Sequence, residues 1–452
     1  MQVMLTSCIK IYKLFTNIMN NNKSKFSREL FVPIINYVKN QEFDKALEQL
    51  ENISDQNPDI INRYRGTIYL NKKDWKNSLK NYQKISDENR SFEILNNIGV
   101  SLYKLGRFSE ASTQFKMSID KNSSFLPAYE NLSITYKLMG NYELSIKYIL
   151  NSLKLNPKNN KLKNQLIDIF NYHDSKIFNN SIINLNNQIK NLNLKKQKNK
   201  LIESSSIKKI LNNSEEILKT SDVNFNYSET QIFRKNKSNL NCKRHLSIFA
   251  KHNIIPRFCF DCYKVQLTLV SVLDLIKIYF YFNDLDLKNN NIRKCVVELR
   301  KGVSGNYKGY IFTNSIEEAK NISDIIYNDL RTDEINLKKI EVKHGCTEYY
   351  ENYNLFKNVE KNITDKLYKN EWAKIEDEFD KEYFTIENIQ ERKFDNTINK
   401  FNLSDFLIIK NWLLYARALD DNSYKEIFSH EIKIDRLSKI EKDKISLRKI
   451  DK

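Results

Sequence analysis

The feature that most constrains this chain is an internal repeat in its N-terminal third. At four places an aromatic residue stands three positions before a small residue, and these places recur at nearly equal intervals along the chain. The segments are Phe43-Asp-Lys-Ala46, Trp75-Lys-Asn-Ser78, Phe108-Ser-Glu-Ala111 and Tyr142-Glu-Leu-Ser145. Four positions after the small residue come Leu50, Tyr82, Phe115 and Ile149 respectively. A period of a few tens of residues predicts stacked copies of one supersecondary unit.

Each unit is predicted to be a pair of antiparallel helices. The small residue lets the two helices approach closely, and the aromatic residue fills the space between them. Glycines fall in register from one unit to the next, Gly66 with Gly99 and Gly106 with Gly140. Because one pair cannot bury its apolar face alone, the pairs are expected to stack into an array.

This pattern resembles the tetratricopeptide repeat family over about residues 30–172, with four units and a closing helix at 159–173. The units at 92–125 and 126–159 carry the pattern most fully. The resemblance implies a concave groove that holds a peptide or a partner protein. Its inner face would include Asn96, Tyr103, Lys104, Glu130 and Lys137. These positions could equally be solvated helix residues without a ligand.

The flanking segments differ in character from the repeats. Residues 1–29 are an N-terminal extension, whose charges at Lys10 and Lys13 interrupt any signal sequence, and translation could also start at Met19. Residues 173–240 are rich in Asn, Lys and Ser and predict a polar, partly helical linker. No apolar run in the sequence is long enough to predict a membrane span.

The net charge of +18 allows two interpretations. A basic protein is attracted to nucleic acid, anionic membranes and acidic partners. However, the lysines are spread along the whole chain together with Asn and Ile, which favours a bias in composition. Nucleic-acid binding is therefore possible but not favoured.

A cluster of cysteine and histidine follows the linker. Cys242-x2-His245 and Cys259-x2-Cys262 form two pairs, which the segment 246–258 separates. A two-residue gap lets a tight turn aim both donors at one ion, and three thiolates with one imidazole are a common ligand set for structural zinc. The sequence therefore predicts zinc bound by Cys242, His245, Cys259 and Cys262. Further possible ligands are His252, Cys295 and Cys346.

Three other interpretations of the cluster stay open. A redox pair of the Cys-x-x-Cys type normally begins a helix, and here the clear helical pattern starts only near Ser271. An iron–sulfur cluster is usually bound by more closely spaced cysteines than these. The third possibility is a buried strand, RFCFDCYKVQLTL, in which cysteine serves as a small apolar residue.

The region 241–350 is predicted to be a small α+β sandwich with one sheet. Helices are expected after Ser271 and over 316–330, where Ser315 and Glu318 form a capping box. Strands are expected at 294–300, 309–314 and 338–345. About residues 230–350 also resemble an uncharacterised domain that accompanies tetratricopeptide repeats in marine bacteria, a resemblance that implies no mechanism.

Several short motifs in this region carry weaker signals. The loop RKGVSGNYKG lacks the helix that a phosphate loop or a KH domain needs, so a hairpin or irregular loop is expected. Glu298-x-Arg300 suggests a metal-dependent nuclease only faintly, because such a site would want lysine in place of Arg300. His344 and Cys346 could form a base and a nucleophile, although such close pairs are usually incidental.

The complete chain is thus expected to have a helical repeat array, a linker, a zinc-stabilised α+β domain and a charged, mostly helical region at 351–452. The leading function is that of a cytoplasmic protein-binding scaffold. The alternatives are an enzyme that acts on a nucleotide, glycan or nucleic acid through the α+β domain, and an RNA-binding protein. Whether the protein is an enzyme is not decided by its sequence.

Overall fold

The structure is a computed structural model with two compact units. Unit 1 comprises Met1–Lys163 with Phe384–Lys393, and unit 2 comprises Asn164–Tyr383 with Phe394–Lys452. The residues that the structure describes are 25–53, 56–192, 201–236, 238, 240–331, 335–359, 363–383 and 395–450. Most of the predicted N-terminal extension lies outside them. No helix within these ranges is both long and apolar enough to cross a membrane.

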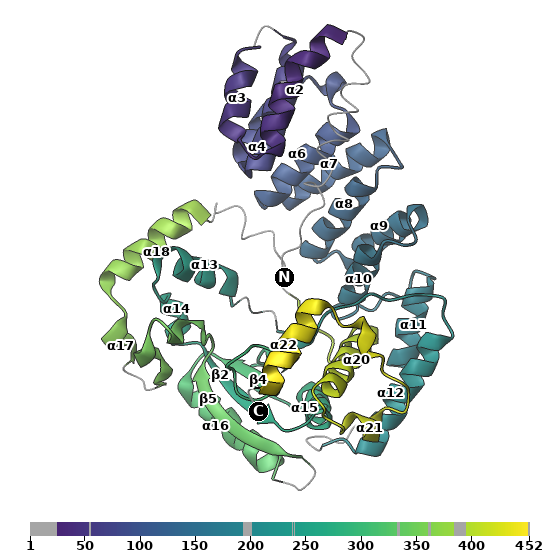
Figure 1. The fold of residues 1–452 in the computed structure, drawn as a ribbon, viewed down its shortest axis with the longest axis vertical. Helices are drawn as coiled ribbons and strands as arrows, with labels where there is room; N and C mark the ends of the chain where they lie inside the picture. Colours follow the sequence, from purple (N-terminus) through teal and green to yellow (C-terminus); the bar gives the residue numbers. More distant parts are fainter. Residues whose placement is uncertain are drawn as a thin grey trace. The chain divides into compact units, whose positions relative to one another are not determined.

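Unit 1 consists of helices joined as successive antiparallel pairs, so the predicted helical repeats are confirmed (Figure 1). The helices are α2 (Lys25–Lys39), α3 (Phe43–Glu51), α4 (Pro58–Lys72), α5 (Trp75–Gln83), α6 (Phe92–Lys104), α7 (Phe108–Lys121), α8 (Leu126–Leu138) and α9 (Tyr142–Leu155). A short 3-10 helix, η2 (Asp87–Asn89), lies between α5 and α6. Each repeated aromatic is the first residue of the second helix in its pair.

The turn inside each pair contains one residue with a left-handed backbone. That residue lies two positions before the aromatic, and the set is Gln41, Lys73, Gly106 and Gly140, with φ between 62° and 79°. Glycine adopts this conformation without a steric penalty, which explains its place in the third and fourth pairs. The repeated sequence pattern therefore indicates both the position of the turn and the start of the second helix.

The small residues of the repeat allow close helix contacts. A Cβ atom added to Gly99 would lie 2.6 Å from the ring of Phe115, and one added to Gly66 would lie 2.9 Å from the ring of Tyr82. Ser78 also donates a hydrogen bond of 3.0 Å to the carbonyl oxygen of Gly66. An aromatic ring from the second helix thus covers the glycine of the first.

The helix α10 (Asn160–Ile169) begins in unit 1 and continues into unit 2. In unit 2, the hydroxyl of Tyr227 donates a hydrogen bond of 2.8 Å to the carboxylate of Asp168. The helix predicted to close the array therefore contributes side chains to the second unit.

Unit 2 contains a five-stranded antiparallel sheet with the order β1-β3-β4-β2-β5. Its strands are β1 (Gln231–Arg234), β2 (Tyr263–Leu269), β3 (Arg293–Val297), β4 (Tyr307–Thr313) and β5 (Leu337–His344). The strands β3, β4 and β5 lie where the sequence predicts them, and the α+β character of this region is confirmed. β1 is an additional strand, contributed by the predicted linker.

Two well-capped helices follow strands of the sheet. They are α15 (Val272–Asp284), with a capping box formed by Ser271 and Asp274, and α16 (Ile316–Asp329), capped by Ser315. Gly309 of β4 lets α15 approach, since a Cβ atom there would lie 3.1 Å from Ile278 and Phe282. One face of the sheet is therefore packed against α15.

The region predicted to be a linker, 173–240, packs as part of unit 2. It forms α11 (Ser181–Lys190), α12 (Ser204–Lys219) and β1, and isoleucines of α11 and α12 are buried. Its many Asn and Lys residues made this region look like a linker in the sequence. Between them, however, each helix carries a short apolar stripe. The segment differs from a linker because these stripes bury against other helices of the unit.

The remaining helices of the described residues belong to the cysteine-containing segment and to the C-terminal part of unit 2 (Figure 1). They are α13 (Cys242–His252), α14 (Arg257–Phe260), α17 (Ile363–Leu367), α18 (Asn370–Tyr383), α20 (Leu403–Ala418), α21 (Tyr424–Ile427) and α22 (Lys439–Ile450), with 3-10 turns η3 (Glu348–Tyr350), η4 (Asn354–Lys357) and η5 (Ile434–Arg436). The basic segment near the end of the chain forms helix α22.

Candidate functional site

The predicted groove residues lie on the first helices of two neighbouring pairs, and two of them are buried between repeats. The side chain of Asn131 donates a hydrogen bond of 2.9 Å to the side-chain oxygen of Asn96. Glu130 accepts hydrogen bonds from Asn159 at 2.8 Å and Lys161 at 3.2 Å. Asn96 and Glu130 therefore connect consecutive repeats.

The other three groove residues reach the surface to different degrees. Tyr103 is half-buried and meets the ring of Phe108 edge-on, with centroids 5.5 Å apart. Lys104 is exposed, with its ammonium 5.5 Å from the ring centroid of Trp75, and Lys137 is half-buried. These side chains remain accessible to a partner.

Arg63, on α4, was not among the predicted groove residues. Arg63, Asn96 and Glu130 follow one another at the interval of the repeat, so the three occupy equivalent positions on successive first helices. Burial lowers the pKa of Arg63, while the carboxylate of Glu93 opposes this shift. The Nε atom of Arg63 has no hydrogen-bond partner among the described residues. The repeat period itself could have identified this position.

A family model described as "Tetratricopeptide repeat" matches residues 126–159. These residues are a tetratricopeptide repeat. The helical pairs before it have the same architecture, and we refer to α2–α9 as the tetratricopeptide array.

Several solved structures are similar to a part of this chain. One, titled "Crystal structure of MamA", is 15% identical with a TM-score of 0.29 and covers 30% of this chain and 82% of its own. "First TPR of Spaghetti (RPAP3) bound to HSP90 peptide SRMEEVD" is 20% identical, with a TM-score of 0.24, and covers 25% of this chain and 89% of its own. "TPR2B-domain:pHsp70-complex of yeast Sti1" is 22% identical, with a TM-score of 0.22, and covers 23% and 84%. A search of curated proteins found no match.

The predicted zinc ligands are placed differently from one another in unit 2. Cys242 begins α13, Cys259 lies in α14 and Cys262 immediately precedes β2. His245 instead stacks on Phe258, with ring centroids 5.0 Å apart, and burial lowers the pKa of its imidazole to about 4. No interaction between His245 and a cysteine occurs within the described parts of the chain.

Cys346, after β5, joins the other three cysteines in place of His245. Its thiol hydrogen-bonds to Cys242, which lowers the pKa of Cys242 to about 7. Cys259 also interacts electrostatically with Cys242 and Cys346. A Cβ atom added to Gly345 would lie 2.5 Å from the Sγ atom of Cys262, so the backbone beside Cys346 touches that thiol. We call these four cysteines the thiol cluster.

The surroundings of the thiol cluster are mainly apolar and aromatic. Cys259 Sγ lies 3.3 Å from the hydroxyl of Tyr349, and both residues are buried. Burial raises the pKa of Cys259 and Cys262 to about 12. Across the described residues, no three His, Cys, Asp or Glu side chains already stand as ligands around a metal ion. A metal would therefore have to draw the thiols closer together.

The contacts of the His344 ring are with residues other than Cys346. Its ring is sandwiched between Tyr263 and Phe356, with centroid distances of 4.9 Å and 4.0 Å. Its Nε2 atom lies 3.1 Å from the carbonyl oxygen of Asn358. Burial lowers the pKa of His344, which keeps the imidazole neutral. The geometry assigns His344 to the core of unit 2.

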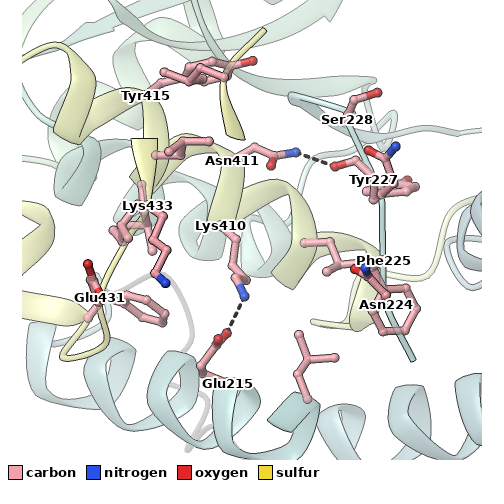
Figure 2. A pocket seen from close by; sticks show the side chains of 18 of the residues that line it. Glu215, Asn224, Phe225, Tyr227, Ser228, Lys410, Asn411, Tyr415, Glu431 and Lys433 are labelled. Atoms are coloured by element: carbon pink, nitrogen blue, oxygen red, sulfur yellow. Dashed lines mark hydrogen bonds and ion pairs between the residues drawn. The ribbon is translucent and has the colours of Figure 1, made fainter. Parts of the chain in front are cut away.

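A pocket of about 690 Å³ lies in unit 2 between α12, α20 and the chain that follows α21. Figure 2 shows Lys410 paired with Glu215, at 2.7 Å, and the amide of Asn411 donating to the carbonyl oxygen of Tyr227, at 2.9 Å. The hydroxyl of Tyr415 donates to Glu441 at 2.6 Å. The polar groups named here already have hydrogen-bond or ion-pair partners in the pocket wall. The pocket therefore does not indicate which ligand it would bind.

Proposed function

We propose that the protein is a binding scaffold whose tetratricopeptide array holds a peptide segment of a partner protein. The repeat fold supports this proposal because stacked helical pairs create an extended concave surface. The observation that carries it is the partly desolvated guanidinium of Arg63, in register with Asn96 and Glu130. Arginine is suited to bind a carboxylate, and the carboxylate of Glu93 already acts on this guanidinium.

The basic groups near this position favour an acidic peptide. Lys104 and Lys137 lie on the following two first helices and reach solvent. A carboxylate at Arg63 and acidic side chains along α6 and α8 would match these charges. The five described cysteines are all free thiols, which supports a cytoplasmic location as part of the same proposal.

Charge reversal tests this function directly. We expect the full chain to bind labelled acidic heptapeptides in preference to basic ones, as measured by fluorescence anisotropy. Arg63→Met or Lys104→Glu should weaken that binding about tenfold, the loss of one charge-assisted hydrogen bond. The matched control is Lys80→Glu, an exposed position on the second helix α5.

Equal affinity for acidic and basic peptides would contradict the proposed groove. An equal loss of peptide affinity in Lys80→Glu would also contradict it. Circular dichroism of each variant should show unchanged helicity, which separates lost binding from lost folding.

We further propose that the thiol cluster holds one structural zinc ion through Cys242, Cys259, Cys262 and Cys346. Four thiolates are a closed tetrahedral ligand set. The proximity of residues from α13, α14 and the end of β5 supports this set over the one that includes His245. Zinc would favour the thiolate forms and connect segments that also meet through a buried, largely aromatic cluster.

Metal analysis of the full chain, purified without added zinc, should find one zinc ion per chain. Cys346→Ser should abolish stoichiometric zinc, whereas His245→Ala should retain it. Cys295→Ala is the matched control, because Cys295 is a buried cysteine on β3 outside the cluster. A folded chain without metal, or zinc that depends on His245 but not Cys346, would refute this ligand set. Thiols that all react freely with an alkylating reagent would do the same.

A further inference from the structure

The sheet of unit 2 has one polar face that the proposed scaffold function does not explain. Directly paired residues of an antiparallel sheet project to the same side. The register pairs Lys264 with Lys343, Gln266 with Tyr310 and Glu341, and Lys294 with Tyr310. We define the cationic sheet face by Lys264, Gln266, Lys294, Glu298, Lys308, Tyr310, Glu341 and Lys343.

Two lysines on this face are covered to an unusual extent. Lys308 is 2% exposed and Lys264 is 7% exposed. The Nζ atom of Lys264 donates a hydrogen bond of 3.0 Å to the carbonyl oxygen of Gly345. Lysine is almost never this buried unless it is paired, because removing an ammonium from water is costly.

The carboxylates of the cationic sheet face are already engaged. Glu298 pairs with Arg300 at 2.8 Å, and Glu341 pairs with Lys339 at 2.5 Å and Lys343 at 2.6 Å. Within the described ranges, no carboxylate lies within ion-pair distance of Lys294 or Lys308. Among the described residues neither ammonium group therefore has a carboxylate at ion-pair distance, while the charge of Glu298 still raises the pKa of both.

Two lysines of this face approach one side chain. The ammonium groups of Lys264 and Lys294 lie 5.3 Å and 5.8 Å from the ring centroid of Tyr310. Lys308 precedes Tyr310 by two positions on β4 and projects to the same face. The lysines thus come from three adjacent strands and lie on the same face of the sheet.

The helix α22 adds a further cation at the end of this face. Arg448 is buried and donates hydrogen bonds to the carbonyl oxygen of Gly305 at 3.0 Å and the side chain of Asn306 at 2.8 Å. Burial lowers the pKa of Lys308 to about 8; the nearby carboxylate of Glu298 opposes this shift, whereas the charges of Lys343 and Arg448 add to it. Burial also lowers the pKa of Lys294. A bound anion would relieve both effects.

We propose that the cationic sheet face is a binding site for the phosphate group of a small phosphorylated ligand, held by Lys264, Lys294 and Lys308. Several ammonium groups on one face match the multiple charges of a phosphate better than the single charge of a carboxylate. The site is distinct from the tetratricopeptide groove. It would give unit 2 a ligand of its own.

Isothermal titration of the full chain with pyrophosphate tests this proposal, with orthophosphate and sulfate as separate arms. We expect saturable binding of pyrophosphate that weakens at least tenfold in Lys308→Met and in Lys294→Gln. The matched control, Lys320→Gln, removes one positive charge from an exposed position on α16 and should bind normally.

Thermal unfolding of the ligand-free variants provides a second measurement. Lys308→Met should unfold at a higher temperature than the unmodified chain, because the variant no longer buries an unpaired charge. A lysine that is merely structural would give the opposite shift.

Three results would overturn the proposal. They are no saturable binding of either phosphate at millimolar concentration, binding that Lys308→Met and Lys294→Gln leave unchanged, and tighter binding of sulfate than of pyrophosphate. A chain that ignores pyrophosphate but binds RNA, with affinity falling steeply as salt rises, would assign the face to a polyanion instead.

Discussion

Replacement of Asp405 by alanine is expected to lower the free energy of unfolding of unit 2 by about 3–5 kcal/mol. Asp405 is 1% exposed and pairs with Arg234, which is 4% exposed, at 2.7 Å. The hydroxyl of Tyr279 also donates to Asp405 at 2.8 Å. Removal of the carboxylate would leave a guanidinium buried without its counter-charge.

Urea denaturation followed by circular dichroism measures this loss, and hydrogen exchange of β1 and α20 assigns it to unit 2. The control is Glu216→Ala, which breaks an exposed ion pair with Lys219 and should change stability by less than about 1 kcal/mol. The double replacement Arg234→Met/Asp405→Leu should recover much of the loss, since no unpaired charge remains. A cost below about 1 kcal/mol for Asp405→Ala would show that the pair is poorly desolvated in solution.

A double-mutant cycle between Gly99 and Phe115 tests the packing of the array. Phe115→Ala should cost about 3–5 kcal/mol, because Phe115 is fully buried. Gly99→Ala alone should cost about 1–3 kcal/mol, because the added Cβ would lie 2.6 Å from the Phe115 ring. On the Phe115→Ala background, however, Gly99→Ala should stabilise the helix by up to about 1 kcal/mol.

Hydrogen exchange of peptides from α6 and α7 reports these changes within unit 1. A change of sign between the two backgrounds is the expected coupling. If Gly99→Ala has the same effect with and without the ring, glycine is required for a reason other than this contact.

The array could be predicted because the sequence pattern that specifies it is local and recurs along the chain. Each aromatic and its small residue lie within one helix, and the same spacing recurs in the next repeat. The helices α15 and α16 were predictable for a similar reason, since Ser271 and Ser315 cap them through neighbours three positions away. Patterns of this kind do not depend on the rest of the fold.

The thiol cluster and the cationic sheet face depend on tertiary pairing instead. Cys346 approaches Cys262 only because β5 pairs with β2, and nothing near His245 in the sequence shows that its ring will stack on Phe258. Likewise, Lys264 and Lys294 meet around Tyr310 only in the register of three strands. Alternating lysines in separate segments look like ordinary surface charge until that register is known.

The pairing of Arg234 with Asp405 has a consequence for how the chain folds during synthesis. These partners are far apart in the sequence, whereas Gly99 and Phe115 lie on the consecutive helices α6 and α7. Long-range contacts delay folding, since the intervening chain must be made and ordered first. During synthesis on the ribosome, we expect the array to fold early. Unit 2 should fold only after α20 has emerged, because until then Arg234 on β1 lacks its counter-ion Asp405.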